Sequence, residues 1–247
     1  DLAALVLGGY GAVNVYRKPV IAFIPTGSEL VPAGSELQRG QNFDCNSVMV
    51  KALLEEMGAK VILHPIVKDD INAISGALNR LLPQVDIVIL NAGTSKGGED
   101  FCVKYLQERG NMLFHGVAAV PGRPMSITMV GPKPVINMSG PAVAALYSCK
   151  WLMGPVIDHM TCNAETKPPL TEVTLTEDMG VPPMFSMFSS LDISLGDDGQ
   201  LLATPVKGRG PGSRGMSAGL LADAHYVSTV GEKPHKAGET ILVRIEH

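Results

Sequence analysis

Short apolar runs alternate with stretches of helical periodicity between residues 18 and 163. The apolar runs predict buried strands at residues 18–25, 60–67, 85–90, 111–117, 126–130 and 134–137. Apolar residues spaced three and four apart predict helices at residues 48–57, 71–81 and 101–109, and from Pro141 to about Met160. We expect Gly154-Pro155 to kink this last helix or to end it early. The alternation indicates a three-layer α/β/α domain, residues 19–163, with a mostly parallel sheet.

The pattern changes after Asn163. Lys167-Pro168-Pro169 is typical of a linker. Short apolar stretches between glycine and proline turns then predict strands at residues 171–176, 185–195, 201–206, 224–230 and 240–245. We therefore expect a small all-β domain over residues 164–247. Residues 1–18 look like the end of a helix broken by glycines, and we interpret them as a segment returning from an N-terminal region of a longer protein.

The turns that follow the predicted parallel strands carry the candidate chemistry. Right-handed crossovers place such turns at one edge of a sheet, and ligands bind outside the carboxyl ends of the strands. We expect four segments to converge there: Thr26 to Glu29, Asp69, residues 93–100 and Ser139 to Pro141.

The glycine-rich turn after the run at residues 85–90 is the strongest candidate. Its free backbone amides favour an anion, and they belong to Gly93, Thr94, Ser95, Lys96 and Gly97. Asp100 follows at the predicted start of a helix, where a carboxylate can hold a divalent cation that the anion also binds. This turn predicts a site for a phosphorylated or oxyanionic ligand with Mg²⁺.

Composition argues against several classes of protein. Hydrophobic residues make up 45% of the chain and charged residues 18%, enough for a sizeable core. The net charge of −4 and the absence of a basic stripe argue against a general nucleic-acid binder. No apolar run reaches the roughly 18 residues of a membrane span. The four cysteines form no CxxC pair, so reduced thiols in a cytoplasmic protein are expected.

Each candidate residue also has a purely structural interpretation. Asp100 at a helix start and the pair Asp69 and Asp70 are explained equally well by helix capping. Lys96 can be a solvated loop residue, and Arg123 in a tight turn can be a surface residue.

Other side chains favour structure over chemistry. Ser95 and Ser139 have no obvious histidine partner, which argues against a nucleophilic serine. His64 and His115 lie in apolar strand contexts that favour structural roles. The glycine-rich segment 208–219 is either a flexible loop or a loop that contacts an anion at the main site.

Five motifs in order resemble one family. The chain reads TGSEL at 26–30, KDD at 68–70, NAGTSKGGEDF at 91–101, PGRP at 121–124 and GP at 140–141. This order is similar to that of the molybdopterin molybdotransferases, the MoeA proteins and the gephyrin E-domain. Members of that family typically read TGDEL, DD, SGGVSVGxxDY, KPGKP and LPGNP.

The resemblance implies a molybdopterin-binding fold followed by a β domain, and it implies a reaction. Adenylylated molybdopterin is bound, molybdate is inserted at the dithiolene, and AMP is released with Mg²⁺ present. It also implies further N-terminal domains and a homodimer whose active sites use both chains. Molybdopterin adenylyltransferase is an expected partner.

The resemblance also implies roles for individual residues. Catalytic roles fall on Glu29, Asp69 and Asp100, and Asp100 is tied to the Mg²⁺ and phosphate site. Gly93, Thr94, Ser95 and Gly97 correspond to the phosphate-facing turn, and Lys96, which has no counterpart there, is expected to add a positive charge that contacts the ligand. Arg123 in the PGRP turn stands in place of the second lysine of KPGKP and is expected to contact the ligand, whereas Ser139 is expected to contact the ligand from its place at the sheet edge.

Several family residues are replaced in this chain. Val120 stands in place of the first lysine of KPGKP, and Ser139 and Ala142 replace both prolines of LPGNP. Ser28 replaces an aspartate, whereas Lys96 adds a charge where an apolar residue is usual. These departures leave open a non-catalytic molybdopterin-binding or scaffold module, and a related nucleotide-dependent transferase is a third alternative.

Overall fold

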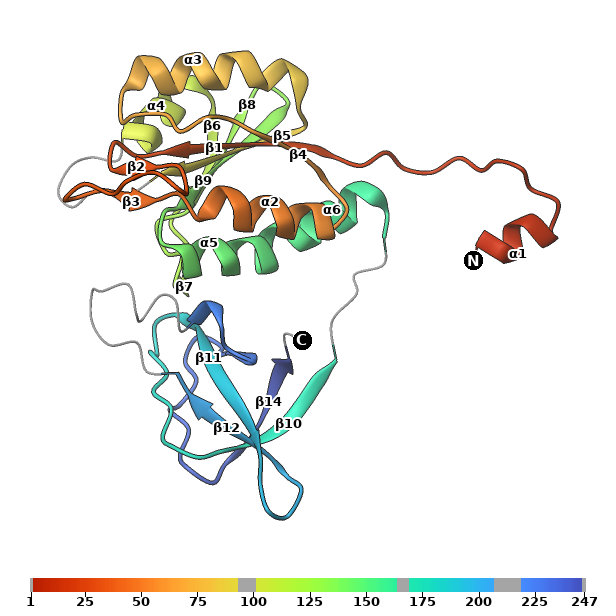
Figure 1. The fold of residues 1–247 in the computed structure, drawn as a ribbon, viewed down its shortest axis with the longest axis vertical. Coiled ribbons are helices and arrows are strands. Elements are labelled where there is room, and N and C mark those ends of the chain that lie inside the picture. Colours follow the sequence, from red (N-terminus) through yellow and green to blue (C-terminus); the bar gives the residue numbers. More distant parts are fainter. Residues whose placement is uncertain (1, 93–100, 164–168, 207–218, 246–247) are drawn as a thin grey trace.

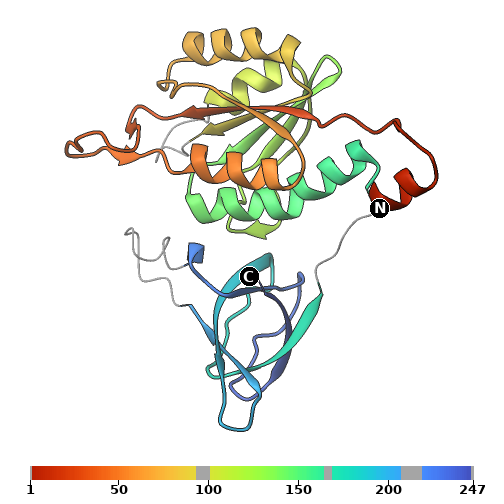
Figure 2. The same ribbon diagram turned by 45° about the vertical axis from the view of Figure 1, so that its right-hand side comes forward.

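The chain forms an α/β lobe and a smaller β lobe. The computed structural model describes residues 2–92, 101–163, 169–206 and 219–245. In Figure 1 the α/β lobe lies above the β lobe, and the segment before the first strand leads away from the sheet to helix α1 (Leu2–Leu7). Figure 2 shows the same separation of the lobes from a second direction.

A six-stranded sheet forms the centre of the α/β lobe, in the order β4-β1-β5-β9-β8-β6. Its strands are β1 (Val20–Thr26), β4 (Lys60–Leu63), β5 (Ile87–Ala92), β6 (Asn111–His115), β8 (Ser126–Val130) and β9 (Lys133–Ser139). Pairings within β4-β1-β5-β9 are parallel, and β8 is antiparallel to both of its neighbours. The predicted, mostly parallel sheet is therefore confirmed.

Helices cover both faces of this sheet (Figure 1). On one face lie α2 (Asn46–Glu56), α5 (Ala142–Ser148), η2 (Cys149–Met153) and α6 (Gly154–Thr161), whereas α3 (Ile71–Leu81), η1 (Leu82–Gln84) and α4 (Phe101–Arg109) lie on the other. Alternate residues of the central strands supply the two cores. Phe23 and Ile89 belong to one core, and Ile24 and Leu90 to the other. This two-sided burial explains why the central strands are apolar throughout.

The long helix predicted after residue 139 begins later and is built differently. Pro141 has φ −56° and ψ 132°, so it precedes the helix instead of forming its first turn. Gly154-Pro155 does not end the helix, because a π-helical segment at Cys149–Met153 leads into α6 with Pro155 in its first turn. Pro155 has no amide to donate to the preceding turn, and the wider π-helical turn lies directly before it, where the regular ladder is already interrupted.

Two predicted strands of the α/β lobe are shorter than expected, as is the strand predicted at residues 224–230 of the β lobe, which ends at Val227. The strand predicted at residues 60–67 ends at Leu63, and Pro65 has no backbone amide to continue the ladder. The strand predicted at residues 111–117 ends at His115, and Gly116 follows with φ +86°. The pattern also did not predict β2 (Leu30–Val31) and β3 (Asn42–Phe43), a parallel pair too short to show periodicity.

The β lobe contains the five strands that the sequence predicted, namely β10 (Leu170–Leu175), β11 (Ser186–Leu195), β12 (Leu201–Pro205), β13 (Ala224–Val227) and β14 (Thr240–Ile245). They pair in the order β12-β10-β14-β13-β11, and a β12–β11 pairing closes them into a barrel. Val173, Leu191 and Val243 are among its buried core residues. Mixed α/β architecture followed by a β barrel agrees with the predicted fold class.

A strand of the α/β lobe joins the β lobe. β7 (Ala119–Val120) pairs in parallel with β11, through Ala119 with Ser186 and Val120 with Met187. Tyr147 of α5 stacks on Phe188 with ring centroids 4.6 Å apart. The sequence did not predict this joint, because the two segments lie more than sixty residues apart.

Tyr147 also connects the joint to two polar groups. Its hydroxyl lies 3.0 Å from Oγ of Ser190, and its ring meets that of His225 edge-on at 5.6 Å. Burial lowers the pKa of His225 to about 4, with smaller contributions from Lys150 and Arg244. His225 is therefore neutral at pH 7 and contributes to the joint as an aromatic ring.

No helix among the described residues is long and apolar enough to cross a membrane.

A loop of the β lobe holds a histidine between two carboxylates. Nδ1 of His235 lies 3.0 Å from Oε2 of Glu239, and its Nε2 lies 2.7 Å from Oε1 of Glu232. Burial lowers the pKa of His235, but the hydrogen bonds to the two carboxylates outweigh it and raise the pKa above its ordinary value. Burial raises the pKa of Glu232, but hydrogen bonds from Thr229 and Tyr226 bring it to about 2. The folded loop therefore favours the imidazolium form of His235.

We expect the stability of the protein to fall at alkaline pH through His235. Because the folded pKa is raised, this stabilisation is fully present below the unfolded pKa of about 6.5 and is lost as the pH rises through the folded pKa. Between about pH 6 and about pH 9, wild type should lose about 1 kcal/mol more unfolding free energy than the His235→Gln variant. Urea unfolding measures the difference, and parallel pH curves for the two proteins would contradict it.

A second prediction concerns the start of α3. Asp70 is the N-cap, and its side chain accepts a hydrogen bond from the amide of Ala73 at 2.8 Å. The expectation that Asp69 shares this role is wrong, because its carboxylate accepts from the amide of Ser28. Asp70→Ala should lower the unfolding free energy by about 1 kcal/mol, and Asp70→Asn, the control that keeps an oxygen acceptor at the cap, by less than about 0.5 kcal/mol. Equal losses in urea unfolding would refute the assignment.

Candidate functional site

A cavity of about 380 Å³ opens at the carboxyl ends of β1, β5 and β9. Its wall comes from four parts of the chain, and the lining residues are Thr26, Glu29, Leu30, Asn42, Phe43, Asp44, Cys45, Asn46, Asn91, Gly140, Pro141 and Ala142. The size is within the range of sites for small organic ligands. This is the sheet edge where the sequence placed the ligand, and the structure brings the TGSEL turn and the Gly140-Pro141 turn together there.

Two buried asparagines connect the strand ends that form this cavity. Nδ2 of Asn91 donates to the carbonyl of Ser139 at 2.9 Å, and Oδ1 of Asn91 accepts from Nδ2 of Asn46 at 2.8 Å. Nδ2 of Asn46 also donates to the carbonyl of Gly140 at 2.6 Å. The hydroxyl of Thr26 donates to the backbone carbonyl of Asn91 at 3.2 Å. One network thus joins the ends of β1, β5 and β9 to the start of α2.

Glu29 reaches the cavity from the turn after β1. Gly27 allows this turn, because a Cβ atom there would lie 2.9 Å from Cγ of Leu30 and 3.0 Å from Oε2 of Glu29. β2 and β3 continue the turn, and Phe43 and Asp44 complete this side of the wall. A larger residue at position 27 would displace the Glu29 side chain.

Asp69 lies beside this turn but does not line the cavity. Its carboxylate accepts from the amide of Ser28 at 3.0 Å, and the Ser28 hydroxyl accepts from the amide of Asp69 at 3.1 Å. This reciprocal pair fixes the TGSEL turn against the segment that leads into α3. Asp69 is therefore joined to the turn that carries Glu29, through its bonds with Ser28.

Asp44 and Cys45 form the rim next to α2. Oδ1 of Asp44 accepts from the amide of Ser47 at 3.0 Å, and its other oxygen accepts from the Ser47 hydroxyl. The carboxylate therefore caps the first turn of α2 and lines the cavity. Cys45 is an exposed free thiol at the same rim.

Two predicted site residues lie elsewhere. Ser139 is buried at the end of β9, and the cavity wall continues from it through Gly140. Arg123 is exposed, and its guanidinium lies 4.9 Å from the ring centre of Phe185 in the β lobe. The structure therefore places Arg123 at the joint between the lobes, apart from Glu29.

The predicted glycine-rich turn lies outside the described residues. This applies to Gly93, Thr94, Ser95, Lys96, Gly97 and Asp100. β5 leads to this segment at Ala92, and Asn91 beside it lines the cavity.

The described wall is acidic and rich in oxygen atoms. Its charged side chains are the carboxylates of Glu29 and Asp44, and its amides are those of Asn42, Asn46 and Asn91. Oxygen donors of this kind suit Mg²⁺. Among the described residues, however, no three His, Cys, Asp or Glu side chains come together as a metal site.

Sequence reasoning missed Asn46 and Asn91 as site residues. Asn91 had a usable signal, because it directly follows the apolar run at residues 85–90 and so falls at the carboxyl end of a predicted parallel strand. Asn46 carries no comparable signal, because it lies at the start of α2 and not at the end of a predicted strand. Its place in the cavity wall depends on α2 packing against the sheet, which periodicity does not show.

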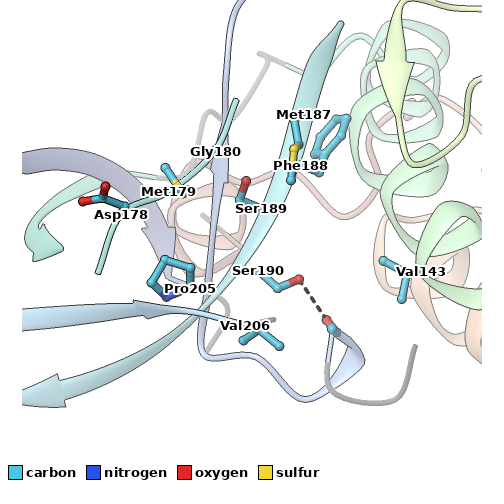
Figure 3. Close-up of a pocket in the computed structure, with 11 residues that line it drawn as sticks. Val143, Asp178, Met179, Gly180, Met187, Phe188, Ser189, Ser190, Pro205 and Val206 are labelled. Carbon is cyan, nitrogen blue, oxygen red and sulfur yellow. Dashed lines mark hydrogen bonds between the residues drawn. The ribbon is translucent and has the colours of Figure 1, made fainter. Parts of the chain in front are cut away.

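A second cavity, of about 490 Å³, lies between α5 and the β lobe (Figure 3). Val143 lies on its α5 side, opposite Met187, Phe188, Ser189 and Ser190 of β11. The hydroxyl of Ser190 donates to the carbonyl of Gly219 at 3.5 Å, the dashed line in the figure. The remaining lining residues are Asp178, Met179, Gly180, Pro205 and Val206. This described wall is mostly apolar, and the sequence did not predict it.

A family model covers the part of the chain that builds the first cavity. The model described as "Probable molybdopterin binding domain" matches residues 22–159, more than half of the chain. Glu29, Asn46, Asn91 and Gly140 all fall within this match.

Curated relatives match over nearly the whole chain. Proteins named molybdopterin molybdenumtransferase from Staphylococcus aureus (strain COL) and Bacillus subtilis (strain 168) are each 30% identical to it, over 97% and 98% of this chain. The aligned regions are 57% and 56% of those relatives, so the chain spans little more than half of their length.

Solved structures show the same fold. Two structures of molybdopterin biosynthesis MoeA protein from Pyrococcus horikoshii superpose with TM-scores of 0.81 and 0.78, at 26% and 24% sequence identity. They cover 98% and 100% of this chain, which corresponds to 58% of each of those chains. The match to the family model decides the assignment: the chain belongs to the family of proteins that carry this probable molybdopterin-binding domain, and it is similar along nearly its whole length to molybdopterin molybdenumtransferases.

Proposed function

We propose that this chain forms the molybdopterin-binding part of a molybdopterin molybdotransferase in molybdenum cofactor biosynthesis. The proposed reaction inserts molybdate into adenylylated molybdopterin and releases AMP, with Mg²⁺ as cofactor. The supporting observation is the cavity at the ends of β1, β5 and β9, which is lined by Glu29 of the TGSEL motif and by Gly140-Pro141. Its position agrees with the rule that ligands of parallel sheets bind at their carboxyl edge.

Several residues of this chain would bind the ligand or hold another residue in place. Backbone amides of residues 93–97 would hold the phosphate groups at the end of β5. Glu29 would contact the ligand from the cavity wall, and Asp69 would hold Glu29 in place through Ser28. Lys96 would contribute a positive charge where Val120 replaces a family lysine.

The oxygen-rich wall fits the proposed metal ion. Asp100 would hold Mg²⁺, with a second carboxylate from Glu29, which lines the cavity, or from Asp69. When bound, Mg²⁺ would offset charge on the pyrophosphate and polarise the bond to be cleaved.

Arg123 takes a different role in this proposal from the one suggested by the family motif. Its guanidinium lies over Phe185 at the joint of the lobes, so contact with a ligand would occur from the interlobe side. Ser139 would act through its backbone carbonyl, which is bonded to Asn91.

The remaining assignments concern the whole protein. We propose domains at residues 19–163 and 164–247, with residues 1–18 as the return segment. A homodimer, a cytoplasmic location and molybdopterin adenylyltransferase as a partner belong to the same proposal, as does the expectation that this chain is inactive alone.

A non-catalytic molybdopterin-binding or scaffold module is the second candidate. It is favoured by Val120, which supplies no charge where the family has a lysine, since an oxyanion such as molybdate requires fixed positive charge. The described residues that line the cavity at the strand ends and the cavity between the lobes also include no lysine or arginine.

The two candidates differ in AMP release. With adenylylated molybdopterin, Mg²⁺ and molybdate, the full-length protein should release AMP. Asp100→Ala should abolish this Mg²⁺-dependent turnover, and Glu29→Gln should lower it roughly 100-fold or more. Asp197→Asn, an exposed change in the β lobe, is the control that should leave turnover intact.

The outcomes separate the proposals. Ligand binding without AMP release would identify the non-catalytic module. Unchanged turnover in Asp100→Ala would remove the role assigned to Asp100.

A further inference from the structure

The side chains of Asn46 in α2 and Asn91 in β5 form hydrogen bonds to other elements of the fold. Both are buried, with 7% and 2% of their surface exposed, and both line the first cavity. Neither amide bonds within its own helix or strand. Instead, the Asn91 side chain bonds to β9 and α2, and the Asn46 side chain bonds to β5 and the Gly140 turn.

We propose that Asn46 and Asn91 are positioning residues for the molybdopterin ligand, an inference that rests on the proposed function. Their shared hydrogen bond fixes the separation of α2, β5 and the Gly140-Pro141 turn, and these elements form the cavity wall. The two asparagines thus keep the cavity in its binding shape before the ligand arrives.

The donor count supports this assignment. Both hydrogens of the Asn46 amide are used, one by Oδ1 of Asn91 and one by the carbonyl of Gly140. The carbonyl of Gly140 lies beyond β9, so the sheet ladder does not satisfy it. The bond from Asn46 therefore holds the turn that carries Pro141 and Ala142 into the cavity wall.

If the two asparagines only stabilised the fold, loss of another equally buried polar group would weaken ligand binding to a similar extent. If they position the cavity wall, only the asparagine variants would weaken binding. Buried polar groups elsewhere in the sheet provide the comparison, and Thr128 of β8 is suitable. It is completely buried, its hydroxyl has no hydrogen-bond partner in the described structure, and it does not line the cavity. Thr128→Val is therefore a burial-matched control.

The test compares wild type, Asn46→Ala, Asn91→Ala and the double variant. For each protein it measures the Kd for purified molybdopterin under anaerobic conditions, and the Tm. Each single variant should raise Kd about 10-fold or more. Because the two side chains share one bond, the double variant should raise Kd less than the product of the two single effects. Thr128→Val should leave Kd within about 2-fold of wild type.

Asn46→Asp adds a second measurement, the pH dependence of Kd, which a loss of stability alone would not produce. At neutral pH its carboxylate would face two oxygen acceptors, Oδ1 of Asn91 and the carbonyl of Gly140. Protonation restores one donor, so its Kd relative to wild type should improve as the pH falls from about 8 to about 5.

The outcomes are distinct. Failure of wild type to bind molybdopterin would overturn the proposed function itself. Wild-type binding with unchanged Kd in the asparagine variants, or with multiplicative effects and no pH response in Asn46→Asp, would overturn the positioning role alone.

Discussion

The hydrogen bonds of Asn91 are the interaction on which the candidate site depends. Parallel strands that end at one edge leave backbone carbonyls with no further ladder partner, and buried carbonyls of this kind need a donor. Asn91 donates to the carbonyl of Ser139, accepts from Asn46 through its side chain, and accepts from Thr26 through its backbone. One side chain thus satisfies the strand ends and joins them to α2. The cavity is lined by these same residues, because the bonds hold the start of α2 and the Gly140 turn against the strand ends.

The joint between the lobes also constrains the structure, and it does so through backbone pairing and aromatic stacking. β7 contributes only two residues, yet it extends the sheet of the β lobe through β11. Tyr147 adds an aromatic stack on Phe188 and a hydroxyl contact with Ser190. Backbone pairing fixes direction, and the aromatic contact adds apolar burial. The second cavity lies against this joint, so any change in the angle between the lobes would alter its shape.

Both cavities have acidic side chains in their walls, although the ligand expected for the family is itself an anion. The described walls carry the carboxylates of Glu29 and Asp44 in one cavity and of Asp178 in the other, and Asp178 is paired with Lys236. An anionic ligand at an acidic wall needs compensating positive charge from a cation or from backbone amides. This requirement is why the glycine-rich turn with Lys96 and Asp100 remains central to the proposed function.

The sequence by itself determined the layers, the direction of the sheet, the five strands of the β lobe and the edge where the cavity lies. These features follow from local periodicity and from the fixed handedness of crossovers, both of which are visible in one dimension. Only the tertiary structure decided that Asp70 caps α3 while Asp69 bonds to Ser28, and that Arg123 lies at the joint. It also decided that Asn46 meets Asn91. The contacts of Asp69, Arg123 and Asn46 join residues distant in sequence, and their partners are set by packing of whole elements, which no local pattern encodes.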